Sequence, residues 1–472
     1  MRDYLMSDDL AEGFRAAAEV AIDTIRGLPD RKPVSPGSPD EELDQLFREG
    51  IGEEGIGLKE AVAEFREKLA PRFMATPHPL YLGLVNSSPL PGGIIGDLFI
   101  SMFNNNAGAA EQGPAAASAE RAVIGFLCKQ LGLEGGTGLI VPGGAIANLT
   151  ALIAARDRAL PMWRESGPLA LPGDPVFYAS DAGHFSLQRA GQALGAGDRS
   201  LHLVPTTNRG EMDPTELEKL IRVDRRAGRA PFCIVGTAGT TTTGAFDPLD
   251  KIADVAESRG LWFHVDAAYG GAVSLSEKHR HLLKGIERAD SVTIDPHKWF
   301  FIPMTAGAVL VRNGEDLLKS FDSTPSYIPT DTEHPDPFRL SFACSRRASA
   351  LKVWLAWRAH GLRVVREAVE RNIELTRYLE ERLRKDGFEI LPDGPISIAC
   401  ARDVPVGMSD EQLDKRQQDL ARAVVRSGVA WFATVMHDEK TWLRFNMVNL
   451  YTAREDIDRL VDSLLACRQD LR

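Results

Sequence analysis

Between about residues 80 and 311, short apolar runs alternate with longer stretches of helical character. The runs are rich in β-branched or aromatic side chains, which is typical of buried strands. Such alternation predicts a mostly parallel sheet with helices on both faces. The predicted strands are residues 138–141, 175–178, 201–204, 232–235, 261–265, 291–294 and 307–311. In this α/β class of fold, ligands bind at the carboxyl ends of the parallel strands.

The first 79 residues have a different pattern and precede the predicted large domain at residues 80–347. Apolar residues recur at helical spacing from Ser7 to about Gly27, and a second helix is predicted over residues 58–69. This segment is too thin to build a core of its own. We therefore expect a helical arm that packs on another surface, such as a second copy of the chain.

The last segment, residues 348–472, returns to a mixture of helices and strands. Helical character runs from residue 348 to 385 and again over residues 457–467. Strands are predicted at residues 388–391, 397–399 and 442–445. This combination predicts a small α+β domain at the carboxyl end of the chain.

Charge and cysteine usage argue against several classes of protein. The formal net charge of -11 opposes nonspecific binding to nucleic acid or to an anionic membrane surface. No apolar run is long enough to cross a bilayer. The opening residues lack the apolar core of a secretory signal, so we expect a cytoplasmic protein. The five cysteines have no Cys-x-x-Cys spacing and no clustered histidines, which argues against a disulfide framework or a metal site.

Two charged residues follow predicted strands and suggest a cofactor. Asp266 directly follows the run 261–265, and Lys298 lies shortly after the run 291–294. Alone, the aspartate could cap a helix and the lysine could be solvated. Together they favour a shared ligand, because a carboxylate in an apolar segment needs a partner. Pyridoxal phosphate needs both groups: an amine to form a Schiff base with its aldehyde, and a carboxylate beside its ring nitrogen.

Three further segments after predicted strands could contact such a cofactor. Gly143-Gly144 precedes a helix, and free N–H groups at a helix start bind phosphate, although the same dipeptide also makes ordinary tight turns. His184 could lie flat against a cofactor ring or simply begin a helix. The threonine-rich segment 236–244 could supply close approach and hydrogen bonds, or form an exposed turn.

As an ordered set, these segments resemble the group II pyridoxal-phosphate-dependent amino acid decarboxylases, which include glutamate, aromatic-amino-acid, histidine and cysteine-sulfinate decarboxylases. The resemblance runs from about His78-Pro79 to the last helix. It is carried by the region of His184 and by residues 142–148, 239–241, 244–248, 264–271 and 295–299. It implies fold type I of the pyridoxal phosphate enzymes, shared with aspartate aminotransferase. It also implies an obligate homodimer with active sites at the subunit interface.

The resemblance further implies roles for individual residues. Lys298 would form the Schiff base, Asp266 would pair with the pyridine nitrogen, and His184 would stack on the ring. Tyr327, on a mobile loop, would return a proton to the substrate carbon after carbon dioxide leaves. The expected cofactor contacts are Gly144, Ala145, Asn148, Thr241, Asp266, Ala268, Asp295, His297 and Lys298. The expected substrate contacts are His78, Asn106, Gly108 and Arg444.

Two segments depart from the family pattern. Residues 104–114 are small and polar where the aromatic-specific enzymes place bulky apolar residues, which weakens an aromatic assignment. Asp295 replaces an asparagine often found before Pro-His-Lys. Because a carboxylate repels phosphate, we expect Asp295 to cap a turn or orient His297 rather than bind the phosphate.

The expected reaction is decarboxylation of an aromatic or acidic L-amino acid to its amine and carbon dioxide. One alternative is decarboxylation with oxidative deamination to an aldehyde, which the presence of Tyr327 argues against. A second is carbon–carbon lyase chemistry on a phosphorylated amino alcohol, which would require additional basic residues at the substrate end. A third is a scaffold dimer without activity, which the presence of Lys298 and Asp266 makes a poor interpretation.

Overall fold

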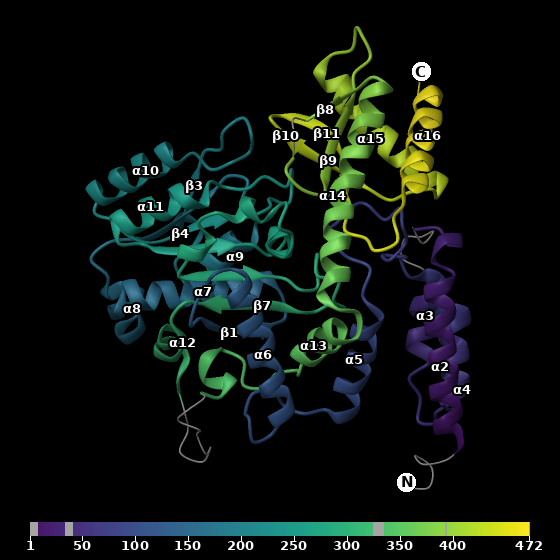
Figure 1. Cartoon of the computed structure of the whole chain (residues 1–472), viewed down its shortest axis with the longest axis horizontal. Coiled ribbons are helices and arrows are strands. Elements are labelled where there is room, and N and C mark those ends of the chain that lie inside the picture. The colour runs from purple at the N-terminus through teal and green to yellow at the C-terminus, as the bar shows by residue number, and fades with distance from the viewer. Residues whose placement is uncertain (1–7, 34–40, 324–334, 392–393, 472) are drawn as a thin grey trace.

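A seven-stranded sheet forms the centre of the computed structural model, which describes residues 8–33, 41–323, 335–391 and 394–471 (Figure 1). Its strand order is β1-β7-β6-β5-β4-β2-β3. The strands are β1 (Thr137–Val141), β2 (Pro175–Ser180), β3 (Leu201–Val204), β4 (Ala230–Thr237), β5 (Trp262–Asp266), β6 (Ser291–Ile294) and β7 (Gly307–Val311). Only β7 runs antiparallel to its neighbours. The predicted mostly parallel sheet is confirmed.

Helices cover both faces of this sheet because successive strand residues point to opposite sides. In β2, Phe177 and Ala179 pack into one core cluster, and Val176 and Tyr178 into another. The first face is covered by α7 (Gly144–Ala159), α9 (Ser186–Ala193) and α12 (Gly314–Phe321), with the short α8 (Pro161–Ser166) following α7. The second face is covered by α6 (Pro114–Gln130), α10 (Pro214–Arg226), α11 (Leu249–Arg259), α13 (Ala350–His360) and part of α14 (Leu362–Lys385).

A second sheet, antiparallel and four-stranded, has the order β10-β11-β9-β8. Its strands are β8 (Phe388–Ile390), β9 (Ile398–Asp403), β10 (Ala433–His437) and β11 (Lys440–Asn446). The helices α14, α15 (Asp410–Ser427) and α16 (Arg454–Asp470) pack around it. The sequence predicted three of these strands but not β10, an edge strand whose residues are half-buried or exposed and therefore give little apolar signal.

The N-terminal helices α2 (Asp8–Arg26), α3 (Glu41–Glu49) and α4 (Leu58–Glu64) lie to one side of the sheets (Figure 1). The backbone N–H of Leu58 donates a hydrogen bond to Asp9, which joins α4 to the start of α2. The following helix, α5 (Pro91–Phe103), packs against α13. No helix in the described ranges is long and apolar enough to span a bilayer.

Candidate active site

A cavity of about 400 Å³ lies at the carboxyl ends of the parallel strands, where the α/β pattern predicted a ligand. Segments that follow β1, β2, β4, β5 and β6 line it. The predicted residues that line this cavity are Gly144, Ala145, Asn148, His184, Thr241, Asp266, Ala268, Asp295, His297 and Lys298. Residues separated by more than 150 positions in the sequence are thus brought to one place by the sheet.

Lys298 lies just beyond β6 and forms an ion pair with Asp295. The Lys298 Nζ is 3.1 Å from the Asp295 Oδ2, and the Asp295 side chain is buried. The Nε2 of His297 is farther from the same oxygen, at 3.8 Å. His297 Nδ1 instead lies 2.8 Å from the carbonyl oxygen and 3.2 Å from the backbone nitrogen of Ala306, and burial lowers the pKa of His297. Asp295 therefore contacts the lysine more closely than the histidine that it was expected to orient.

Asp266 ends β5, and its carboxylate is held by two donors. Its Oδ2 accepts a hydrogen bond from Asn148 Nδ2 at 2.8 Å, and its Oδ1 accepts one from the backbone N–H of Ala268 at 3.1 Å. Both bonds involve an ionisable acceptor, which makes them stronger than bonds between neutral groups. They fix the orientation of the carboxylate at the cavity wall.

His184 follows β2 and faces the cavity with its ring partly buried. The backbone N–H of Ser186 lies 3.2 Å from His184 Nδ1. Because a backbone N–H can only donate, Nδ1 accepts, and the neutral ring carries its proton on Nε2. Burial lowers the pKa of His184, which favours this neutral form.

The helix α7 begins at the cavity and supplies free backbone N–H groups. Gly143 precedes the helix without a side-chain cap, and Gly144 is its first residue. The first N–H groups of a helix have no carbonyl partner inside it, so they are available to an anion. A Cβ on Gly144 would lie 2.9 Å from the Asp295 Oδ2, so a larger residue here would require the Asp295 side chain to shift.

Arg444 of β11 lies directly behind Thr241, which lines the cavity after β4. Its Nε donates to the carbonyl oxygen of Thr241 at 2.8 Å, and its Nη1 donates to the carbonyl oxygen of Gly83. Its Nη2 is buried without a hydrogen-bond partner among the described residues. Arg444 thus connects the four-stranded sheet to the cavity wall and retains one donor without a partner among the described residues.

None of the four predicted substrate residues, His78, Asn106, Gly108 and Arg444, is among the described residues that line the cavity. His78 is buried, and its Nδ1 accepts from the backbone N–H of Leu80 at 2.9 Å. The Oδ1 of Asn106 accepts from the backbone N–H groups of Gly108 and Arg346. Tyr327, the predicted proton donor, lies outside the described residues.

Several cavity residues were not predicted from the sequence. Ser186, Tyr269 and Met304 line the cavity without having been named as site residues, whereas Thr237, which also lines it, belongs to the threonine-rich segment 236–244 considered above. Ser186 and Tyr269 stand two and three residues from His184 and Asp266, so proximity to a predicted residue was the available signal. Met304 belongs to an irregular segment between β6 and β7, for which periodicity gives no indication.

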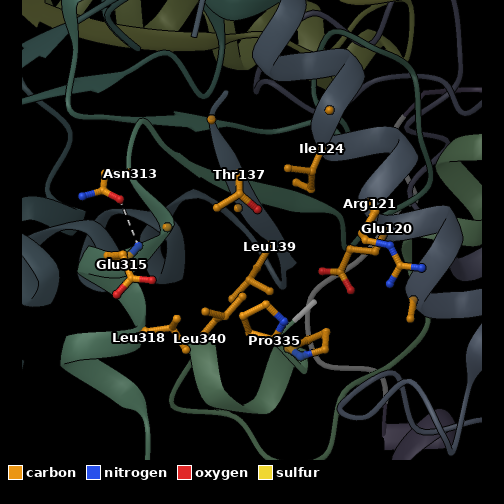
Figure 2. A pocket seen from close by; sticks show the side chains of 16 residues that line it. Glu120, Arg121, Ile124, Thr137, Leu139, Asn313, Glu315, Leu318, Pro335 and Leu340 are labelled. Carbon is orange, nitrogen blue, oxygen red and sulfur yellow. Dashed lines mark hydrogen bonds between the residues drawn. The ribbon is translucent and has the colours of Figure 1, made fainter. Parts of the chain in front are cut away.

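A different cavity, of about 450 Å³, lies between α6, β1 and α12 (Figure 2). Glu120 borders it, but the Glu120 carboxylate already pairs with Arg346 and accepts from the backbone N–H of Ile140 at 2.6 Å. Leucines 139, 318 and 340 gather on another side of this cavity (Figure 2). None of the predicted site residues lines it. No group of three or more potential metal ligands occurs in the described parts of the chain.

The first cavity fits pyridoxal phosphate by the chemistry of its lining. Lys298 offers a primary amine, Asp266 offers a fixed carboxylate, and the start of α7 offers free N–H groups for a phosphate. The Thr237 Oγ1 is buried without a partner among the described residues, and Thr237 lines the cavity, so a further hydroxyl donor is available to a bound group.

Known proteins share both sequence and fold with this chain. It is 32% identical to the aromatic-L-amino-acid decarboxylase of Bacillus atrophaeus, over 99% of this chain and 97% of the relative. It is also 32% identical to the cysteine sulfinic acid decarboxylase of Mus musculus, over 98% of this chain and 96% of the relative. The structure of the Oryza sativa TDC with PLP and tryptamine superposes with a TM-score of 0.93 at 25% identity, over 99% of both chains.

These similarities confirm the predicted fold type I and the predicted cofactor, pyridoxal phosphate. The profile described as the pyridoxal-dependent decarboxylase conserved domain matches residues 42–402. The chain belongs to the pyridoxal-dependent decarboxylase family and is a pyridoxal-phosphate-dependent carboxy-lyase that acts on an amino acid.

Proposed function

We propose that the protein converts an aromatic or acidic L-amino acid to the corresponding amine and carbon dioxide, with Lys298, Asp266 and His184 as the central residues. The observation that carries this proposal is their convergence. All three line one cavity, together with the uncapped start of α7. An amine, a carboxylate, an aromatic ring and a phosphate site in one cavity are the four features that the cofactor requires.

Each residue has a distinct proposed task. When bound, pyridoxal phosphate supplies an aldehyde for amines and a protonated ring that accepts an electron pair. Lys298 would hold the cofactor through its Nζ, and the substrate amine would take its place. Asp266, fixed by Asn148 and Ala268, keeps the ring nitrogen protonated. Such preorganised charge contributes several kcal/mol in comparable sites, on the order of 3–4 kcal/mol for one group.

The substrate carboxylate is proposed to lie on the small-domain side of the cavity. Arg444 supports this placement because its Nη2 is buried and lacks a partner among the described residues. The neutral His184 ring would lie against the ring of the cofactor. Gly144, Ala145, Thr241, Ala268 and His297 complete the cofactor contacts, and Asp295 pairs with Lys298.

The proton that replaces carbon dioxide is proposed to come from Tyr327, on the basis of the family resemblance. A group that donates a proton at the reacting carbon must come within hydrogen-bonding distance of it. Replacing Tyr327 by phenylalanine tests this role: in the presence of dioxygen as the oxidant, amine formation should fall while carbon dioxide release continues, and aldehyde, ammonia and hydrogen peroxide should accumulate. Unchanged amine formation would contradict it.

We further propose a homodimer with its active sites at the subunit interface. One face of α5 presents apolar side chains that are 44–69% exposed, namely Ile95, Leu98, Phe99, Met102 and Phe103. Exposed apolar patches of this kind are typical of protein interfaces. Asn106 and Gly108 follow α5 within five residues, so they would lie close to this interface. Sedimentation of the wild type and of Leu98→Glu tests this: a dimer and a monomer are expected, respectively.

An assay of reaction products, rather than of substrate binding, would identify the substrate. The purified enzyme, loaded with pyridoxal phosphate, is incubated with aromatic, acidic and sulfinate L-amino acids while carbon dioxide, amine and aldehyde are recorded. We expect carbon dioxide and amine in equal amounts from one class. Aldehyde in place of amine would indicate oxidative deamination, and turnover without carbon dioxide would indicate a carbon–carbon lyase. Absence of carbon dioxide from every amino acid would refute the proposal.

A further inference from the structure

We propose that Asn148 and His264 are positioning residues: through one directed chain of hydrogen bonds they fix the orientation of Asp266 and the proton position on His184. The proposal rests on the function proposed above and extends it from Asn148, which lines the cavity, to His264, which is not among the described lining residues. Its basis is a buried network in which the donor and the acceptor of each bond can be assigned.

Asn148 is the centre of this network and is 1% exposed. Its Nδ2 faces the Oδ2 of Asp266 at 2.8 Å. An ionised carboxylate only accepts hydrogen bonds, so the amide nitrogen must face it and the amide oxygen must face the other way. On that side, Oδ1 lies 2.6 Å from the hydroxyl of Thr293 and 3.1 Å from the Nε2 of His264. Both of these groups therefore donate.

His264 is fully buried on β5, two residues before Asp266. Its Nε2 carries a proton because it faces the amide oxygen of Asn148. Its Nδ1 lies 2.8 Å from the Oγ of Ser291, which already accepts a hydrogen bond from the Nε1 of Trp262 at 2.7 Å. The hydroxyl proton of Ser291 is then directed at Nδ1. Burial also lowers the pKa of His264 to about 4, which keeps the ring neutral.

The second branch leads from Asn148 to the cavity. The other Nδ2 proton of Asn148 is directed at the Oγ of Ser186, 3.2 Å away. Ser186 Oγ lies 2.8 Å from the Nδ1 of His184, so its own proton points to that nitrogen, to which the backbone N–H of Ser186 also donates at 3.2 Å. The remaining proton of the neutral His184 ring is then on Nε2. A network with every member satisfied holds one arrangement more firmly than its separate bonds would.

Asn148 is the only one of these residues that bonds to both branches, which makes it the most informative position to change. Without its amide, Asp266 loses a donor and Ser186 loses the partner that sets its hydroxyl direction. Neither loss affects Lys298, the residue proposed to bond covalently to the cofactor. The expected effect is therefore on cofactor affinity and on the histidine proton positions.

The proton positions can be measured directly by NMR of the full-length protein labelled with ¹⁵N in its histidine rings, with and without pyridoxal phosphate. Signals of His184 and His264 are assigned by their loss in His184→Gln and His264→Gln. Without cofactor, both rings should give the pattern of a neutral ring protonated on Nε2. A ring protonated on Nδ1 at either position would overturn the proposal.

A variant pair tests the role of the amide. Asn148→Asp keeps the shape but replaces the donor by a second carboxylate, and Thr150→Val is its matched control on the same helix. Thr150 is also buried, but within the described ranges its hydroxyl bonds only to the carbonyl oxygen of Ile146. Asn148→Asp should raise the dissociation constant of pyridoxal phosphate by about 10- to 100-fold, the range expected when a charged group loses its donor. The ¹⁵N signals of His264 should move toward the protonated ring, and Thr150→Val should change neither.

Wild-type cofactor affinity and unchanged His264 signals in Asn148→Asp would overturn the proposal. If that variant does not fold, Thr293→Val removes one donor to the same amide oxygen at nearly constant shape. It should weaken cofactor binding in the same direction, and wild-type affinity would count against the proposal. These readouts do not depend on turnover. Failure of every amino acid to release carbon dioxide would refute the proposed function alone, while these results would still decide the role of Asn148.

Discussion

Asp295 stands three residues before Lys298, and its Oδ2 lies 3.1 Å from the lysine Nζ. Its other carboxylate oxygen is buried without a partner among the described residues. The carboxylate also lies against Gly144, at the start of the helix that offers N–H groups to a phosphate. Asp295 therefore has two effects before cofactor binds: it holds the lysine ammonium, and it places a negative charge beside the phosphate site.

Asp295→Asn should strengthen capture of pyridoxal phosphate by the cofactor-free protein. The lysine must leave its ion pair before it reacts with an aldehyde, and the phosphate must approach a negative charge. Asparagine keeps the shape and removes both obstacles. We expect the dissociation constant to fall by about tenfold, which corresponds to about 1.4 kcal/mol. Absorbance titration measures it, and weaker binding would indicate that the carboxylate assists capture instead.

Asp266→Ala should lower the rate of decarboxylation by at least about 100-fold, because the ring nitrogen loses the charge that keeps it protonated. Carbon dioxide release under saturating cofactor measures this loss. Pyridoxal phosphate methylated on the ring nitrogen carries a permanent positive charge there. This methylated cofactor should restore part of the decarboxylation rate of Asp266→Ala. It should not raise the rate of the wild type. Lack of any recovery would argue that Asp266 acts by another route.

The ion pair between Glu120 and Arg346 should be important for stability. Both side chains are 6% exposed, and Arg346 Nη1 lies 3.0 Å from Glu120 Oε2. Arg346→Met leaves a buried carboxylate without its partner, which costs about 3–5 kcal/mol of unfolding free energy. The double variant Glu120→Leu, Arg346→Met should lose less than Arg346→Met alone. Urea unfolding measures both, and strictly additive losses would contradict an ion pair of this kind.

His78 should make the protein less stable in mild acid. Burial lowers its pKa to about 4, whereas an exposed histidine titrates near 6.5. Below pH 6.5 the unfolded chain therefore binds a proton that the folded chain excludes, and stability falls as the pH drops toward 4. His78→Asn keeps an acceptor for the N–H of Leu80 and should remove about 3 kcal/mol of this loss. If the unfolding free energies of the wild type and of His78→Asn fall in parallel as the pH drops, this role of His78 is contradicted.

Much of the fold could be predicted because each central strand is a compact apolar run. The run 232–235, for example, lies inside β4, and 291–294 coincides with β6. The edge strand β10 escaped prediction because it has one neighbouring strand and no continuous apolar face. Local composition identifies an element that is buried on both faces more readily than one at an edge.

The site residues that could be predicted are reactive side chains at or shortly after the end of a predicted strand, such as Asp266 and Lys298. Its supporting contacts were not. Asn148 meets His264 across 116 positions and Thr293 across 145, and no local pattern links these residues. The pairing of Asp295 with Lys298 depends on the turn between them, whose geometry the residue types alone left open.

Reduction of the cofactor-loaded enzyme with borohydride, followed by peptide mass mapping, tests the central claim most directly. Borohydride makes the bond between a lysine and pyridoxal phosphate permanent, so the added mass marks the lysine that holds the cofactor. The account predicts that the mass lies on Lys298, that Lys298→Ala carries none, and that this variant lacks the yellow absorbance and turnover. Added mass on another lysine, or none in an active wild-type enzyme, would contradict it.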